Sequence, residues 1–276
     1  MRIILLTSAN HIYGNYIIKK LIEARKEEIV AIIESEVLLH KKSFPTAILK
    51  YLRSSGTYYV VAQAVKQESF KVGSLLYRLL HVQQPSSIFF SYKTMANQYS
   101  IPIYKTKDIN NAISLNLIKD LNPNLLVSIF FNQILSKKLL SISQDCINIH
   151  PAYLPSYKGI SPVFWALAND ESYTGVTVHY IDEGIDTGEV IYQKEIPISP
   201  NDTEHSLYFK CCEAGTALLL KALMDFESGK VKPVNDKNTE DSYFSLPTKQ
   251  AVRQFRRNGR KFFRLRNLRL AFEDYK

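Results

Sequence analysis

The chain has 276 residues, of which 46% are hydrophobic, and a net charge of +9 at pH 7. This apolar fraction supports a packed core, whereas the absence of an 18-residue apolar run argues against a membrane-spanning helix. Three cysteines, two of them adjacent, do not form a disulfide or zinc-ligand pattern. The short apolar start fits a first strand better than a signal peptide. We therefore expect a cytoplasmic protein that binds no metal.

The first 35 residues predict a strand, a helix and a second strand. Residues 2–7 are apolar and β-branched, residues 13–25 carry helical spacing, and residues 28–33 repeat the strand pattern. Gly14 stands alone after the first strand, so the glycine pattern of a dinucleotide site is missing and we expect no NAD. This order predicts an α/β, Rossmann-like fold with a mostly parallel sheet and flanking helices.

Residues 36–85 predict a helical insertion that is rich in tyrosine, leucine and basic side chains. Helical patterns cover residues 45–52, 58–65 and 74–80. The plainer interpretation is a helical hairpin packed on the sheet. The alternative is a cationic, aromatic surface that lies at an interface.

Short helices and strands alternate over the next part of the chain. Helices are expected at 94–99 and 110–121, and strands at 101–104 and 125–130. The last of these strands is apolar except for Ser128, which indicates that it is buried on both faces.

Residues 146–162 begin as a strand and stop abruptly. Asn148 and His150 alternate with isoleucines, so they share one face, and Pro151 ends the strand. An amide can donate to an oxyanion and an imidazole can carry a proton, so the pair suits a reaction through a tetrahedral oxyanion. A structural histidine at a strand end is the alternative, and spacing alone leaves both open.

The chain continues with a helix at 162–168, strands at 175–181 and 190–198, and a long helix at 204–227. Thr203 is the expected N-cap of that long helix. On the first of the two strands His179 alternates with valines, and we interpret it as a structural histidine.

Two motifs in this part of the chain resemble one family. Residues 148–159, Asn-Ile-His-Pro-Ala-Tyr-Leu-Pro-Ser-Tyr-Lys-Gly, resemble the signature of the folate-dependent formyltransferases, and residues 182–188, Asp-Glu-Gly-Ile-Asp-Thr-Gly, resemble a second family element. The resemblance implies a catalytic set of Asn148, His150 and Asp186. It also implies formyl transfer from 10-formyltetrahydrofolate, as co-substrate, to a primary amine.

The same resemblance implies where the two substrates bind. The folate pocket is expected at Phe131, Gln133, Ile134, Leu135, Asp182, Gly184 and Ile185. The acceptor is expected near Asn10, His11, Tyr153 and Lys158, the lysine being placed to meet a diphosphate.

The loop at 153–162 looks nearest to the nucleotide-sugar N-formyltransferases, which implies a small-molecule acceptor, the amino group of a nucleotide-linked sugar. The alternatives are a methionyl-tRNA formyltransferase-like enzyme that lacks the usual C-terminal domain, a formyltetrahydrofolate hydrolase, and a non-catalytic protein that binds RNA or membrane. We expect no stable nucleic-acid complex, and the oligomeric state is left open.

Residues 1–230 are predicted to form the catalytic domain and residues 231–276 a basic C-terminal extension. Residues 248–270 hold nine Lys or Arg side chains and no acid. One prediction is that this tail docks on an anionic membrane surface or a polyanion. The alternative is a solvated basic helix packed on the catalytic domain.

Overall fold

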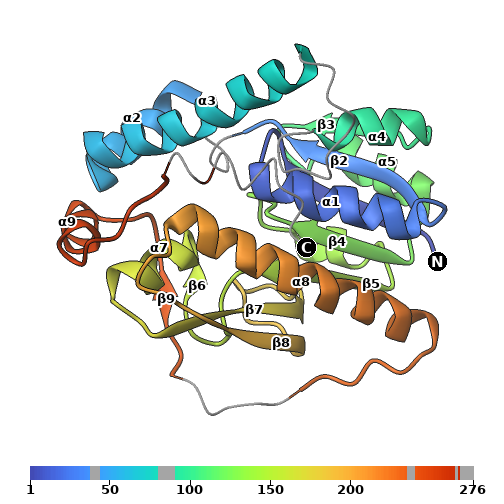
Figure 1. Ribbon diagram of the computed structural model, residues 1–276. Helices are drawn as coiled ribbons and strands as arrows, with labels where there is room; N and C mark the ends of the chain where they lie inside the picture. Colours follow the sequence, from blue (N-terminus) through green and yellow to red (C-terminus); the bar gives the residue numbers. More distant parts are fainter. Residues whose placement is uncertain (38–43, 80–90, 235–239, 265–266, 268–276) are drawn as a thin grey trace.

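A seven-stranded sheet forms the centre of the protein, as a computed structural model shows (Figure 1). The structure describes residues 1–37, 44–79, 91–234, 240–264 and 267. The strand order is β3-β2-β1-β4-β5-β7-β8. The strands are β1 (Ile3–Ser8), β2 (Ile29–Ser35), β3 (Ile103–Thr106), β4 (Leu125–Ile129), β5 (Asp145–His150), β7 (Tyr173–Tyr180) and β8 (Val190–Pro197).

Strands β1 to β5 run parallel to one another, and β7 and β8 extend the sheet as antiparallel strands. The predicted Rossmann-like fold with a mostly parallel sheet is therefore confirmed. The strand order reverses its direction between β1 and β4, and such a switch point is where open α/β sheets bind ligands, outside the carboxyl ends of the strands.

Helices cover both faces of the sheet, because its central strands are apolar on both sides. In β1, Ile3 and Leu5 face one hydrophobic core, while Ile4 and Leu6 face the other. The helices are α1 (Ile12–Arg25), α2 (Phe44–Ser55), α3 (Thr57–Leu79), α4 (Tyr92–Gln98), α5 (Ala112–Leu121), α6 (Lys137–Leu140), α7 (Pro162–Ala168), α8 (Glu204–Glu227) and α9 (Lys249–Arg257). None of the helices described is long and apolar enough to cross a bilayer.

The predicted insertion contains two helices, α2 and α3. Residues 58–65 and 74–79 of the two patterns belong to one continuous helix, and no proline interrupts residues 57–79. The prediction of two separate helices there was wrong. A buried ion pair of 2.8 Å between Lys66 and Glu204 joins α3 to the first turn of α8. The ends of the predicted insertion, residues 38–43 and 80–85, lie outside the described residues.

The basic tail packs on the domain through one apolar face. Val252 and Phe255 of α9 are buried together with Phe262 in the core that α7 also joins, while Arg253, Arg256 and Arg257 are exposed. This is the arrangement of the alternative interpretation, and it gives no support to docking of residues 248–270 on a membrane or polyanion. Two further basic residues of this tail, Arg266 and Arg269, lie outside the described residues. The domain boundary at residue 230 stays a prediction.

Candidate active site

Strand β5 presents two polar side chains at its carboxyl end. In the antiparallel register with β7, Asn148 lies opposite His179 and His150 lies opposite Thr177. Cross-strand partners project their side chains to the same face, so Asn148 and His179 are neighbours. The imidazoles of His150 and His179 are buried, with 6% and 2% of their side-chain surface exposed.

Asp186 lies on the loop between β7 and β8. Its backbone has a left-handed φ of 53°, and the loop is shaped by Asp182, whose Oδ1 accepts from the Gly184 amide at 3.0 Å and the Thr187 hydroxyl at 2.7 Å. Asp186 Oδ2 accepts a hydrogen bond of 2.9 Å from the Gly159 amide. Its carboxylate is therefore held over the end of β5.

The structure brings the three predicted catalytic residues together. Asp186 Oδ1 lies 3.6 Å from His150 Nδ1 and 3.4 Å from Asn148 Nδ2. One carboxylate oxygen thus faces both the imidazole and the amide, while the other is bound to backbone. Such a cluster has a proton carrier and a hydrogen-bond donor side by side.

The Tyr157 carbonyl determines which ring nitrogen of His150 carries a proton. His150 Nε2 lies 3.0 Å from this carbonyl oxygen, which can only accept, so Nε2 is the donor. Nδ1 is consequently the nitrogen that faces Asp186. In the neutral ring Nδ1 can accept a proton, and once protonated it can donate to an oxygen.

His179 belongs to the same cluster, which the sequence did not predict. Its Nδ1 donates to the Tyr180 carbonyl at 2.7 Å, so Nε2 is the acceptor that receives the Asn148 amide at 3.1 Å. Burial lowers the pKa of His179 to about 4, so the ring is neutral at pH 7. His179 therefore fixes the orientation of the Asn148 side chain.

The buried neutral histidine predicts a loss of stability in acid. The pKa of His179 is about 4 when folded and about 6.5 when unfolded. Between these values the unfolded chain binds more protons, so stability falls as pH falls. From pH 7 to pH 5 this one group should remove on the order of 1–2 kcal/mol. Urea unfolding at both pH values should show a smaller loss for His179→Gln than for the wild type, and an equal loss would contradict the assignment.

A family model described as formyl transferase matches residues 1–223. The chain belongs to this formyl transferase family.

Several relatives of the family carry more specific names. A methionyl-tRNA formyltransferase of Halothermothrix orenii is 41% identical over 150 residues, which are 54% of this chain and 47% of that protein. The chain thus spans about half the length of the curated relatives it matches. Among solved structures, the N-formyltransferase of Helicobacter canadensis has a TM-score of 0.58 at 21% identity, covering 97% of this chain and 82% of that one. Phosphoribosylglycinamide formyltransferase of Anaplasma phagocytophilum has a TM-score of 0.58 at 19% identity, covering 89% and 98%.

The loops that the family resemblance assigns to folate meet beside the catalytic cluster. Lys137, at the end of the loop that follows β4, forms an ion pair of 2.9 Å with Glu183 of the loop that holds Asp186. Ile134 and Ile185, one from each loop, are 52% and 41% exposed. Exposed apolar side chains on two adjoining loops suit a flat aromatic ring such as a pterin.

The other predicted folate residues have structural contacts of their own. The Gln133 amide is buried, accepting from the Ile109 amide at 2.8 Å and donating to Ser35 Oγ at 2.7 Å. Phe131 is half-buried, and Leu135 is buried in the core beneath the loop. Any contact of Gln133 with a ligand would therefore come through its backbone.

The residues predicted for the acceptor do not form one cluster of free polar groups. Lys158 is 12% exposed and forms an ion pair of 2.6 Å with Asp241. Tyr153 packs so closely on Gly175 that an added methyl group there would lie 2.7 Å from its Cβ. Asn10 is exposed at the start of α1, and its carbonyl accepts from Gln67 of the insertion at 3.0 Å.

His11 is the N-cap of α1 and cannot supply a positive charge. Its Nδ1 accepts from the Gly14 amide at 3.2 Å, and its ring stacks on Phe130 with centroids 4.3 Å apart. Burial, with a smaller contribution from the Lys66 charge, lowers the pKa of His11 to about 3. A neutral capping histidine can pack beside a substrate but gives no ionic contact with a phosphate.

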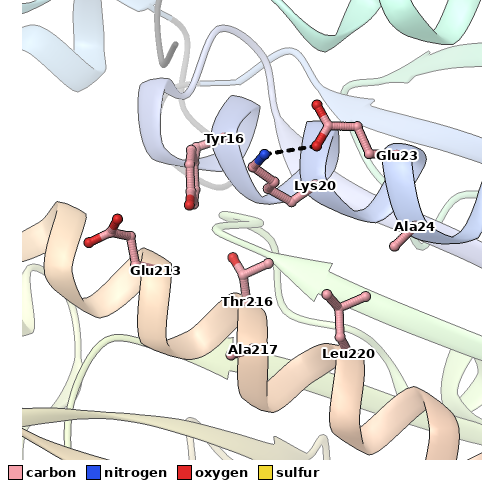
Figure 2. A pocket seen from close by; sticks show the side chains of 8 residues that line it. All are labelled: Tyr16, Lys20, Glu23, Ala24, Glu213, Thr216, Ala217 and Leu220. Atoms are coloured by element: carbon pink, nitrogen blue, oxygen red, sulfur yellow. Dashed lines mark hydrogen bonds and ion pairs between the residues drawn. The ribbon is translucent and has the colours of Figure 1, made fainter. Parts of the chain in front are cut away.

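A separate groove of about 450 Å³ lies between α1 and α8 (Figure 2). Tyr16 and Lys20 of α1 face Glu213 and Thr216 of α8 across it, and the lysine is bound to Glu23 at 2.8 Å. None of the predicted site residues lines this groove, so it is distinct from the cluster at the end of β5.

Proposed function

We propose that this protein transfers a formyl group from 10-formyltetrahydrofolate to a primary amine, and that the amine belongs to a nucleotide-linked amino sugar. The observation that carries the proposal is the convergence of Asn148, His150 and Asp186 at the end of β5. Family membership gives this cluster its reaction class, since an arrangement of amide, imidazole and carboxylate serves several reactions.

In the proposed reaction each of the three side chains has a part. The amine nitrogen forms a bond to the formyl carbon, and the bond from that carbon to the folate nitrogen breaks. Asn148 Nδ2 and protonated His150 Nδ1 are the donors for the formyl oxygen as it gains negative charge. Asp186 lies within reach of both, and it can receive the proton that the amine loses, directly or through one water. That proton leaves with the folate nitrogen.

The proposed donor fits the two adjoining loops. Ile185, which directly precedes Asp186, and Ile134 of the other loop are exposed apolar side chains that can contact a pterin ring. The Helicobacter canadensis N-formyltransferase was solved with folinic acid, a folate, and with dTDP-3-aminofucose. That pair of ligands supports both halves of the proposal.

Methionyl-tRNA is the second candidate for the acceptor. The observation that favours it is sequence identity, since the curated methionyl-tRNA formyltransferases reach 41% over 150 residues. Because the chain spans about half of those proteins, their acceptor is not carried over by identity alone.

We expect the purified protein to consume 10-formyltetrahydrofolate only when a suitable amine is present. The release of tetrahydrofolate should be measured with nucleotide-linked 3- and 4-amino sugars, with methionyl-tRNA and without an acceptor. Turnover with an amino sugar supports the first candidate, and turnover with methionyl-tRNA only would replace it by the second. Equal release without an amine indicates a hydrolase, and calorimetry that detects no folate binding by folded protein would count against the whole proposal.

A further inference from the structure

The residues that hold the catalytic cluster come from the irregular loop that follows β5, here residues 155–160. Its Tyr157 carbonyl binds His150 Nε2, and its Gly159 amide binds Asp186 Oδ2. Tyr157 and Gly159 have left-handed φ values of 61° and 96°. A non-glycine residue in this region costs about 1–2 kcal/mol, so the loop needs support from other parts of the chain.

That support comes from a segment far along the sequence, residues 240–244, which we call the strap. Its core is β9 (Tyr243–Phe244), which pairs in parallel with β6 (Lys158–Gly159) within the loop. We propose that the strap is a positioning element of the active site, which aims the two peptide groups of the loop at His150 and Asp186. This inference rests on the proposed function for its kinetic consequences.

Backbone pairing explains how the strap aims the loop. The Lys158 amide donates to the Ser242 carbonyl at 2.9 Å, and the Ile160 amide donates to the Phe244 carbonyl at 2.8 Å. Along a segment that pairs as a strand, as Lys158–Gly159 does here, alternate amides point to opposite sides. Binding residues 158 and 160 to the strap therefore turns the Gly159 amide to the other side, where Asp186 accepts it.

The Tyr157 carbonyl shares its peptide group with the Lys158 amide that the strap binds, and a side chain of the strap holds the preceding peptide group of Tyr157. Ser242 Oγ accepts from the Tyr157 amide at 2.9 Å, and the carbonyl of Tyr157 is the group that binds His150. The Tyr157 ring stacks on Phe244 with centroids 5.0 Å apart. These contacts hold Tyr157 in its left-handed conformation from both its amide and its ring.

The loop and the strap fit so closely that only glycine is possible at residue 159. A Cβ there would lie 2.2 Å from the Phe244 carbonyl oxygen, inside van der Waals contact with backbone. Around this contact, the Lys158–Asp241 ion pair of 2.6 Å and a bond of 2.6 Å from Ser156 Oγ to the Glu240 carbonyl extend the interface. The partner of Lys158 in this structure is thus the strap.

The strap predicts a defect in turnover that does not follow from weaker substrate binding. In Ser242→Ala the Tyr157 amide loses its acceptor, and small displacements of catalytic groups have large effects on rate. We expect kcat to fall about tenfold, while KM for folate and amine stays within about twofold. Ser242→Thr keeps the hydroxyl and should recover most of kcat. Ser245→Ala is the matched control, because Ser245 follows the strap and contacts Trp165 through its backbone carbonyl.

A second measurement is independent of turnover. The ¹⁵N signal of His150 Nε2, assigned by its loss in His150→Ala, reports the bond to Tyr157. It should shift in Ser242→Ala and keep its position in Ser245→Ala. An unmoved signal, a kcat within twofold of the wild type, or an equal loss in the control would each overturn the proposal. If the wild type shows no turnover with any acceptor, the proposed function fails, and the ¹⁵N comparison still decides on the strap.

Discussion

Replacing His150 with alanine is expected to lower the rate of formyl transfer about 100-fold or more, and Asp186→Ala is expected to do the same. His150 is the proton carrier whose Nδ1 lies 3.6 Å from the carboxylate, and Asp186 accepts from the Asn148 amide at 3.4 Å. Loss of either side chain removes the group on which the other depends.

The double variant tests whether the two residues act as a unit. Because Asp186 contributes through His150 as well as directly, the combined loss should be much smaller than the product of the two single losses. Turnover should be measured at saturating folate and amine, with circular dichroism to confirm that each variant is folded. A near-normal rate in either folded single variant would remove the proposed mechanism.

The largest expected effect on stability comes from Lys66→Ala, with a loss of about 3–5 kcal/mol. Lys66 and Glu204 are 7% and 2% exposed, and their charged atoms lie 2.8 Å apart. Without the lysine, the Gln63 amide, at 3.0 Å, is the one side-chain partner that the Glu204 carboxylate keeps among the described residues. Leaving a carboxylate buried and unpaired costs more than the pair itself contributes.

The chain offers a matched control for this prediction. Lys71 and Glu68 lie on the same helix at 2.6 Å, yet they are 55% and 63% exposed. Lys71→Ala should therefore change the free energy of unfolding in urea by about 0.5 kcal/mol or less. Combining Lys66→Met with Glu204→Gln removes both charges and should cost less than Lys66→Ala alone. A loss in Lys66→Ala that is no larger than in Lys71→Ala would show that the buried pair does not anchor the insertion.

Local sequence patterns predicted several of the elements that position the site. Helices α7 and α8 begin and end at the residues predicted for them, since a proline opens the first and Thr203 caps the second. Asn148 and His150 share a face because strand residues alternate, and Pro151 ends the strand. These features depend on residues that are only a few positions apart, so they can be predicted from the sequence alone.

Contacts between distant residues required the folded structure. The patterns in the insertion did not show that 57–79 is a single helix, because a polar run at residues 66–69 separates its apolar segments. His179 was interpreted as structural, and only its register with Asn148 placed it in the site. The antiparallel pairing of β5 with β7 decides that register, and it depends on sheet order rather than on the strand itself.

The sequence by itself determined the family motifs, the α/β class and the face of β5 that carries the catalytic pair. Tertiary structure decided how those residues are held. Strands β6 and β9 have two residues each, too short for any periodic pattern, and the bond from the Tyr157 amide to Ser242 spans 85 positions. Such a short pairing forms because the rest of the fold already holds both segments close together. The other contacts of the fold therefore offset the chain entropy that is lost when the two segments are joined. For this reason the position of His150 and Asp186 depends on a strap that no local signal marks.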